Sequence, residues 1–184
     1  MNSKLQIISG KYGGRKLALP VAARPTQNKA RIALFNMLDE VLGANMRSQT
    51  VWDAFAGSGE FGIEFLSRDW ANDVIFTDID SDAIKTINKN LVGIARNPII
   101  RQIDATVAAD KFGAAADVIF IDPPYNKPEL GEQLILKLSQ IAKPGAIIIW
   151  EMENSDSKPE IQDSFIILKD KTYGRARFLI IKKV

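Results

Sequence analysis

One four-residue stretch places a carboxylate, two prolines and an aromatic ring directly after an apolar run. The run spans residues 118–121, and the stretch that follows it is Asp122-Pro123-Pro124-Tyr125. Short β-branched and aromatic runs between polar residues are typical of buried parallel strands. Two prolines continue neither a helix nor a strand ladder, so an extended turn must follow the strand. The stretch therefore predicts an acid and a ring at the carboxyl edge of a sheet, where open α/β sheets bind ligands; an ordinary turn capped by Asp122 is the alternative.

A glycine-containing turn joins a second strand to a helix earlier in the chain. The strand is expected at 51–55, the turn at 56–59 and the helix at 60–68. Such units bind phosphates or nucleotides at the helix N-terminus, and Gly57, Gly59 and Gly62 satisfy the dinucleotide spacing G-x-G-x-x-G. Asp53, however, lies inside the end of this strand, just before the turn, where its carboxylate would repel a pyrophosphate placed on the turn and would suit a cationic ligand instead. This residue favours S-adenosylmethionine over a dinucleotide as the ligand; a glycine turn that binds nothing is the alternative.

Composition limits the chemistry that the chain can perform. It has 184 residues, 46% of them hydrophobic and 25% charged, which fits one globular domain with a sizeable core. Because it contains no cysteine and no histidine, disulfides, thiolate nucleophiles, Ser-His triads and His-ligated metal sites are excluded, and no metal is expected. The net charge of +2 predicts no general attraction to polyanions, so any nucleic-acid surface must be a local patch. No signal-peptide core or membrane-spanning run is recognisable, and a soluble, cytoplasmic protein is expected.

Two further carboxylates follow expected strands. Asp78 comes directly after the apolar run 74–77, a position from which an acid accepts hydrogen bonds from ribose hydroxyls. Asp104 follows the strand expected at 99–103 and is placed to meet an adenine amino group, although a helix cap or a turn suits it nearly as well.

The N-terminal part combines an expected β-hairpin with an amphipathic helix. Short apolar runs at 5–9 and 16–19 flank a glycine-containing turn, which predicts two strands. Apolar residues recur at helical spacing between 27 and 42, with Thr26 as the expected N-cap. A basic hairpin that carries Tyr12 can contact phosphates and stack on a base. A solvated charged hairpin is the equally weighted alternative.

The rest of the chain alternates strands and helices and then ends in two strands. The expected elements after residue 78 are a helix at 82–94 capped by Asp80 or Ser81, a strand at 99–103, a helix at 128–141 and strands at 146–150, 164–168 and 177–181. The last two strands, joined by residues 169–175 without a helix, must pair antiparallel. The sequence thus predicts an α/β fold with a Rossmann-like, mainly parallel seven-stranded sheet, a C-terminal antiparallel hairpin, and an N-terminal β-hairpin and helix.

The order of these residues resembles that of class I S-adenosylmethionine-dependent methyltransferases. The similarity rests on the Asp-x-Phe-x-Gly-x-Gly stretch from Asp53 to Gly59, the acids Asp78 and Asp104, and then Asp-Pro-Pro-Tyr. Within that class, Asp-Pro-Pro-Tyr marks enzymes that methylate exocyclic amino groups of bases. The N-terminal part, through its residues 8–17, 24–26 and 34–36, is similar to the RsmD family, and the resemblance covers nearly the whole chain. Members of that family methylate N2 of one guanine in bacterial small-subunit ribosomal RNA.

The resemblance implies a monomeric enzyme that acts on 16S ribosomal RNA or the small ribosomal subunit, with residues 1–44 as an RNA-binding extension and 45–184 as the methyltransferase domain. The residues implied for the cofactor are Asp53, Ala54, Phe55, Gly57, Gly59, Asp78, Ile79, Asp104 and Ala105. The catalytic residues implied are Asp122, Pro123, Pro124 and Tyr125. Asp122 and the Pro123 carbonyl would hold the amine, and Tyr125 would stack on an extruded base. The cations expected at RNA phosphates are Lys11, Arg15, Lys16, Arg24, Lys29 and Arg31.

One departure and three alternatives accompany the resemblance. The family usually carries Asp-Arg-x-Arg-Glu after Arg-Pro-Thr, whereas this chain has Asn-Lys-Ala-Arg-Ile at 28–32, so only positive charge is expected of this helix start. An N6-adenine nucleic-acid methyltransferase would use the same core. A glutamine-amide methyltransferase usually shows Asn-Pro-Pro-Tyr, against which Asp122 argues. A non-catalytic RNA-binding module with a methyltransferase-like fold is the alternative from a different class.

Overall fold

The computed structural model describes residues 5–20, 28–43, 49–94, 96–155 and 159–184. The elements are α1 (Asn28–Leu42), β1 (Gln49–Asp53), α2 (Glu60–Ser67), β2 (Ala71–Asp78), α3 (Ser81–Leu91), β3 (Ile99–Gln102), α4 (Ala105–Phe112), β4 (Val118–Ile121), α5 (Glu129–Ile141), β5 (Ile147–Glu153), β6 (Phe165–Tyr173) and β7 (Ala176–Lys183). They build one seven-stranded sheet in the order β3-β2-β1-β4-β5-β7-β6. Strands β1 to β5 are parallel, and β7 pairs antiparallel with both β5 and β6, which confirms the expected α/β architecture. None of the helices in these ranges is long and apolar enough to cross a bilayer.

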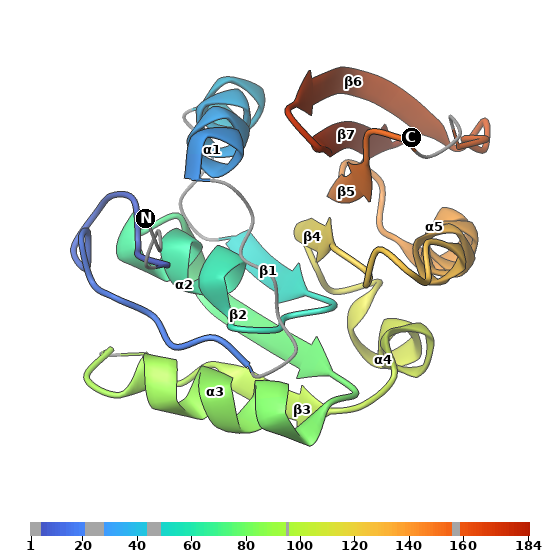
Figure 1. The fold of residues 1–184 in the computed structure, drawn as a ribbon. Helices are drawn as coiled ribbons and strands as arrows, with labels where there is room; N and C mark the ends of the chain where they lie inside the picture. Colours follow the sequence, from blue (N-terminus) through green and yellow to red (C-terminus); the bar gives the residue numbers. More distant parts are fainter. Residues whose placement is uncertain (1–4, 21–27, 44–48, 95, 156–158) are drawn as a thin grey trace.

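Helices cover both faces of the sheet (Figure 1). α1, α2 and α3 lie on one face, and α4 and α5 lie on the other. Because the centre of the sheet is buried on both faces, β4 is a continuous apolar run, and all of its residues are buried. The chain winds outward from β1 to β3 on one side and from β4 onward on the other. The carboxyl ends of β1 and β4 therefore form the point where the strand order reverses, which is where sheets of this kind bind ligands.

The N-terminal segment and one helix differ from the expected elements. The N-terminal strands at 5–9 and 16–19 are reduced to a single bridge between Gln6 and Lys16, because much of the backbone hydrogen bonding of this segment is made to α2. Helix α4 was not expected, because its eight residues are rich in alanine, which gives little periodic signal.

The C-terminal hairpin is longer than expected. β6 continues to Tyr173, through residues that the sequence assigned to a connection, and a two-residue loop leads into β7. β6 is an edge strand, and an edge strand pairs on one side only and tolerates charged side chains. Residues 169–173 of β6 are therefore polar, and they form no apolar run by which this part of the strand could be predicted.

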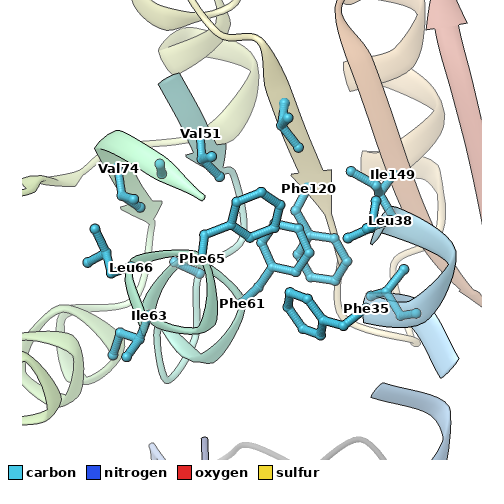
Figure 2. Packing of buried hydrophobic residues seen from close by; sticks show 14 of the residues in the cluster. Phe35, Leu38, Val51, Phe61, Ile63, Phe65, Leu66, Val74, Phe120 and Ile149 are labelled. Atoms are coloured by element: carbon cyan, nitrogen blue, oxygen red, sulfur yellow. The ribbon is translucent and has the colours of Figure 1, made fainter. Parts of the chain in front are cut away.

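Four phenylalanines fasten α1 and α2 to the sheet (Figure 2). Phe61 of α2 stacks on Phe120 of β4, with ring centroids 3.9 Å apart and planes 7° from parallel. The ring centroid of Phe35 in α1 lies 5.6 Å from that of Phe61 and 5.9 Å from that of Phe65. Such pairs add about 0.5–1.5 kcal/mol each beyond the burial of their area. Because Phe120 precedes Asp122 by two residues, this cluster fixes the strand end that carries the Asp-Pro-Pro-Tyr motif.

A buried carboxylate holds the N-terminal segment on α2. Glu64 is fully buried and accepts hydrogen bonds from the backbone N–H groups of Ile8, at 2.7 Å, and Ser9, at 3.0 Å. Its other partner is Arg68, whose Nε lies 2.7 Å from Glu64 Oε1. The carboxylate therefore keeps its charge compensated while it satisfies two backbone donors that no strand pairs.

Ser67, one turn further along α2, adds a second tie. Its hydroxyl accepts from the backbone N–H of Tyr12 at 2.9 Å, and its carbonyl accepts from the N–H of Lys11 at 2.7 Å. Gly10 passes so close that a Cβ there would lie 2.0 Å from the Ser67 carbonyl oxygen. The segment thus needs glycine at position 10 to reach α2.

We predict that Gly10→Ala detaches the N-terminal segment, whereas Gly14→Ala does not. Both residues have positive φ, 82° and 80°, but a Cβ on Gly14 would meet nothing within 4 Å. Gly14→Ala should cost only the left-handed backbone penalty of roughly 1–2 kcal/mol. Gly10→Ala should cost at least about 2 kcal/mol more, through overlap and broken hydrogen bonds. Denaturant unfolding of the two variants measures the difference, and equal free energies of unfolding would contradict the described packing.

Candidate active site

Three carboxylates lie at the carboxyl ends of three neighbouring parallel strands. Asp53 ends β1, Asp122 follows β4, and Glu151 lies near the end of β5. The register pairs Ile121 with Trp150, which makes Asp122 the cross-strand neighbour of Glu151. The residues two positions before the three acids are Val51, Phe120 and Ile149, which all belong to the core layer beneath α1, α2 and α3. Since side chains alternate along a strand, the three carboxylates share that face, and all of them line one small pocket. We call them the carboxylate row.

Burial makes two acids of this row, Asp53 and Asp122, costly to ionise. Asp53 is 1% exposed, and burial raises its pKa to about 7. The charge of Asp78 raises this pKa further, whereas the hydrogen bond from the Gly62 N–H, at 3.2 Å, lowers it. Burial also raises the pKa of Asp122 well above its usual range, and the charges of Glu151 and Asp53 add to the effect. Both acids would be ionised more readily beside a cation or N–H donors.

Hydrogen bonds fix the turn that leaves β1. Trp52 Nε1 donates to Thr77 Oγ1, and that hydroxyl donates to the Ala54 carbonyl, both at 2.9 Å and both buried. The backbone N–H of Ala54 donates to the Phe120 carbonyl at 3.0 Å, and that of Ala56 to the Thr77 carbonyl at 2.9 Å. The turn is therefore tied to β2 on one side and to β4 on the other.

The glycine turn is closed by the acid at the end of β2. Gly57 and Gly59 adopt positive φ of 52° and 76°, which glycine reaches without a steric penalty. The Gly57 N–H donates to Asp78 Oδ2 at 2.8 Å, and the Asp80 N–H donates to Asp78 Oδ1 at 2.9 Å. Burial raises the pKa of Asp78. Each carboxylate oxygen has a further lone pair, so Asp78 can still accept donors from a ligand.

A groove of about 820 Å³ runs along this edge of the sheet. All four residues of the Asp-Pro-Pro-Tyr motif line it, as do seven of the nine residues expected to hold a cofactor. Of the other two, Asp53 lines an adjoining pocket of about 120 Å³, and Gly59 is the N-cap of α2. The charged residues that line the groove are Asp78, Asp80, Asp104, Asp122 and Lys127. Its volume suits a drug-sized ligand, and its excess of carboxylates suits a cationic one.

Tyr125 connects the motif to the carboxylate row. Its hydroxyl donates to Glu151 Oε1 at 3.4 Å, and its ring is half-buried in the groove wall. Burial, with the neighbouring charges of Glu151 and Asp122, raises the pKa of the hydroxyl, so it remains protonated and able to donate. The N–H of Lys127 donates to the Pro124 carbonyl at 2.8 Å and closes the turn after the motif.

Two other acids at this edge cap helices. Asp80 accepts from the Asp82 N–H at 2.9 Å as the N-cap of α3, which confirms one of the two expected caps. Asp104 is the N-cap of α4 and accepts from the Thr106 N–H at 2.8 Å, as the alternative interpretation of this residue predicted. The hydrogen bonds from Thr106 are the main reason why the pKa of Asp104 is lowered. Asp104 also lines the groove, so capping and ligand contact are compatible.

The expected RNA-contacting cations occupy different surroundings. Lys11, Lys16 and Lys29 are exposed. Arg15 is half-buried and donates to the Val92 carbonyl at 2.5 Å. Arg24 lies outside the described residues.

Arg31 is a correction to that set, because it is only 4% exposed. It forms an ion pair with Glu60, and its guanidinium donates to the Gln6 carbonyl and to Asn28 Oδ1, both at 3.0 Å. Burial lowers its pKa to about 10. Arg31 lies on the inner side of α1, where it joins this helix to α2 and to the N-terminal segment, so it does not belong to an exposed phosphate-binding surface.

Sequence reasoning missed two residues of the site. Glu151 directly follows the apolar run 146–150, and an acid at that position after an expected strand was the available signal. Asn90 of α3 donates to the Ser58 carbonyl at 2.8 Å and accepts from the Ala18 N–H at 2.8 Å, which ties the N-terminal segment to the glycine turn. Nothing in the sequence distinguishes Asn90 from a surface polar residue.

A protein family described as "Conserved hypothetical protein 95" matches residues 5–182. The chain belongs to this family. Two relatives are named "Ribosomal RNA small subunit methyltransferase D". The one from Haemophilus influenzae is 32% identical over 93% of this chain and 90% of its own length. The one from Escherichia coli is 28% identical over 99% of this chain and 91% of its own length. These names confirm the resemblance and the expectation of a methyltransferase.

A solved structure supports the same placement. "Putative methyltransferase yhhF from Escherichia coli" superposes with a TM-score of 0.81, at 28% identity over 98% of both chains. The Rossmann-like methyltransferase fold is therefore shared along the whole chain, including the N-terminal part.

We predict that Asp53→Asn makes the protein more stable at high pH but not at low pH. The folded-state pKa of about 7 exceeds the ordinary value of 3.8, so this group favours folding below about pH 4 and loses that contribution as the pH rises to about 7. Asparagine can still accept the Gly62 N–H and never ionises. From pH 4 to pH 8, the variant should gain up to about 4 kcal/mol relative to the original chain.

Asp104→Asn provides a control of opposite sign, because its hydrogen bonds lower the folded-state pKa of that acid. Its stabilising contribution is present above about pH 4 and is lost only as the pH falls further, through the lowered pKa, so Asp104→Asn should be less stable than the original chain by a similar amount at pH 4 and at pH 8. Denaturant unfolding at both pH values measures the two differences. A pH-independent effect of Asp53→Asn would contradict the burial of its charge.

Proposed function

We propose that this chain transfers a methyl group from S-adenosylmethionine to the exocyclic N2 amine of a guanine in bacterial 16S ribosomal RNA. The observation that carries the proposal is the Asp-Pro-Pro-Tyr motif at the wall of an acidic groove, at the point where the strand order reverses. The choice of ribosomal RNA is supported by relatives named ribosomal RNA small subunit methyltransferase D. The substrate is the free RNA or the small ribosomal subunit, and the enzyme acts as a monomer.

The groove fits the cofactor. A Cβ on Gly57 would meet nothing nearer than 4.0 Å, so the glycine turn leaves open space for a ligand. Asp78 would accept the ribose hydroxyls and Asp104 the adenine amine, while the exposed side chain of Ile79 offers an apolar wall. Asp53 would face the cationic end, where a positive charge favours its ionised form. S-adenosylmethionine supplies a methyl group that is activated by its positively charged sulfur.

The Asp-Pro-Pro-Tyr motif would make the base amine a better nucleophile. The lone pair of a base amine is delocalised into the ring, so the amine attacks poorly while it stays planar. Hydrogen bonds from the amine to the Asp122 carboxylate and the Pro123 carbonyl would favour a pyramidal nitrogen with an available lone pair. The methylated amine must release a proton near neutral pH. A carboxyl group whose pKa is raised, such as that of Asp122, is suited to lie close to that proton. Tyr125 would hold the extruded base by stacking, which contributes about 1–3 kcal/mol.

Residues 1–44 would bring the RNA to the groove. Lys11, Lys16 and Lys29 are exposed, and Lys11 Nζ lies 5.5 Å from the centre of the Tyr12 ring. Arg15 and Arg24 belong to the same proposed surface. Asn90 connects this segment to the glycine turn, so RNA bound here would be held at a fixed position relative to the cofactor.

Labelled S-adenosylmethionine tests the proposal. The protein is incubated with ribosomal RNA, and separately with small subunits, from a strain that lacks it, and the labelled nucleosides are identified by mass. N2-methylguanosine is expected. Labelled N6-methyladenosine would indicate the adenine alternative, and RNA binding without transfer would indicate the non-catalytic one.

We predict that Asp122→Ala and Asp78→Ala separate catalysis from cofactor binding. Asp122→Ala removes the acceptor of the amine and should abolish transfer, while the dissociation constant of the cofactor changes by less than about threefold. Asp78→Ala removes a proposed ribose contact and should weaken cofactor binding by about 10-fold or more, which corresponds to roughly 1.4 kcal/mol. Calorimetry and transfer assays on both variants measure this separation. A large fall in cofactor affinity in Asp122→Ala, or unchanged affinity in Asp78→Ala, would contradict the assignments.

A charge reversal tests the RNA surface. The double variant Lys11→Glu and Lys16→Glu should weaken RNA binding and reduce the slope of log affinity against log salt by about 2, one for each phosphate that the protein no longer neutralises. The matched control reverses Lys111 and Lys182, which are exposed at the ends of α4 and β7, away from the groove. Salt titrations of RNA binding compare the two proteins. Equal slopes would remove the N-terminal surface from the proposal.

A further inference from the structure

The side chain of Asn90, in α3, binds the backbone of two segments at once. The residue is only 4% exposed. Its Oδ1 accepts from the Ala18 N–H at 2.8 Å, and its Nδ2 donates to the carbonyls of Ala18, at 3.0 Å, and Ser58, at 2.8 Å. The two bonds to Ala18 are those that a residue of a neighbouring strand would make. Since both amide hydrogens are used and buried, Asn90 holds the N-terminal segment and the glycine turn at one fixed separation.

The two residues after Ala18 stand at the proposed cofactor site. Leu19 lines the small pocket of about 120 Å³, and Pro20 lines the groove of about 820 Å³. Ser58, the other residue that Asn90 holds, also lines the small pocket. The N-terminal segment therefore supplies one wall of these spaces and the glycine turn another, and Asn90 sets the distance between the two walls.

Leu19 is exposed where it borders the small pocket. It is 37% exposed, although Leu17 and Pro20 on either side of it are buried. Asp53, which is proposed to face the cationic end of S-adenosylmethionine, lines the same pocket. A ligand whose cationic end lies beside Asp53 would therefore cover Leu19. This contact would remove apolar surface from water and strengthen the attraction between the two charges by keeping water away from them.

We propose that the N-terminal segment forms a wall of the cofactor site, with Leu19 in contact with the cationic end of S-adenosylmethionine and Asn90 as the residue that positions this wall. The inference rests on the proposed cofactor. It gives the segment that is proposed to bind RNA a second role, in binding the methyl donor. Asn90 acts through Ala18 and Ser58 and touches neither the cofactor nor the RNA, so it is a positioning residue.

Asn90→Asp tests the positioning role. Aspartate keeps an acceptor for the Ala18 N–H but turns a second oxygen toward the carbonyls of Ala18 and Ser58, so both donated hydrogen bonds are lost. Calorimetry with S-adenosylmethionine should show a dissociation constant raised by about 10-fold or more. Asn88→Asp is the matched control, because Asn88 is an exposed residue of the same helix that donates to the Ile84 carbonyl. Its affinity should equal that of the original chain.

Transfer kinetics distinguish a displaced wall from a loss of folded enzyme. Loss of folded enzyme lowers kcat and leaves the KM for S-adenosylmethionine unchanged, because the remaining sites are intact. A displaced wall should instead raise this KM by about 10-fold or more, while kcat at saturating cofactor stays within about threefold of the original value. Unchanged affinity in Asn90→Asp, or a fall in kcat with an unchanged KM, would overturn the inference.

Leu19→Ala tests the wall itself and does not depend on the folding of Asn90→Asp. Because Leu19 is partly exposed, its truncation leaves the core packed. The loss of apolar contact should raise the dissociation constant of S-adenosylmethionine by about 3-fold to 10-fold. Leu136→Ala, which truncates an exposed leucine of α5, should leave it unchanged. Equal affinities of Leu19→Ala and the original chain would overturn the inference alone, whereas an original chain that does not bind S-adenosylmethionine would overturn the proposed function with it.

Discussion

The desolvation of acids at one edge of a parallel sheet is the constraint on which this structure depends. The register of β1, β4 and β5 brings Asp53, Asp122 and Glu151 onto one face, beside apolar layers that exclude water. Burial raises the pKa of Asp53 to about 7 and that of Asp122 well above its usual range. Acids kept in this state favour ligands that bring positive charge or N–H donors, and a sulfonium cofactor and a base amine are such ligands.

A rigid support keeps these acids in place. The stacked pair Phe61 and Phe120 lies two residues from Asp122, and the Trp52–Thr77 hydrogen bond joins β1 to β2 at the level of Asp53. Glu64 binds the N-terminal segment to the same helix that carries Phe61. The N-terminal segment and the sheet edge that carries the Asp-Pro-Pro-Tyr motif are therefore parts of one packed body.

Local patterns predicted much of this arrangement, and contacts between distant segments account for the rest. The run 118–121, the glycine turn and the Asp-Pro-Pro-Tyr motif were recognisable because strand composition and proline restrict the backbone locally. Glu151 escaped notice because only the pairing of β4 with β5 sets it beside Asp122. Arg31 was predicted to be a surface cation because a charged side chain is usually exposed. It lies instead on the inner side of α1, where Glu60 pairs with it. The N-terminal strands are limited to one bridge because Glu64, 55 residues or more away, accepts the N–H groups of Ile8 and Ser9.

The titration of the Asp53 carboxyl group tests the central claim most directly. Carboxyl carbon shifts can be followed by NMR against pH in the protein alone and with S-adenosylmethionine, and Asp53→Asn assigns the signal. The account predicts a midpoint near pH 7 in the protein alone, in accord with the raised pKa, and a clear fall when the cationic cofactor binds. A midpoint near the ordinary value of 3.8, unchanged by the cofactor, would contradict it.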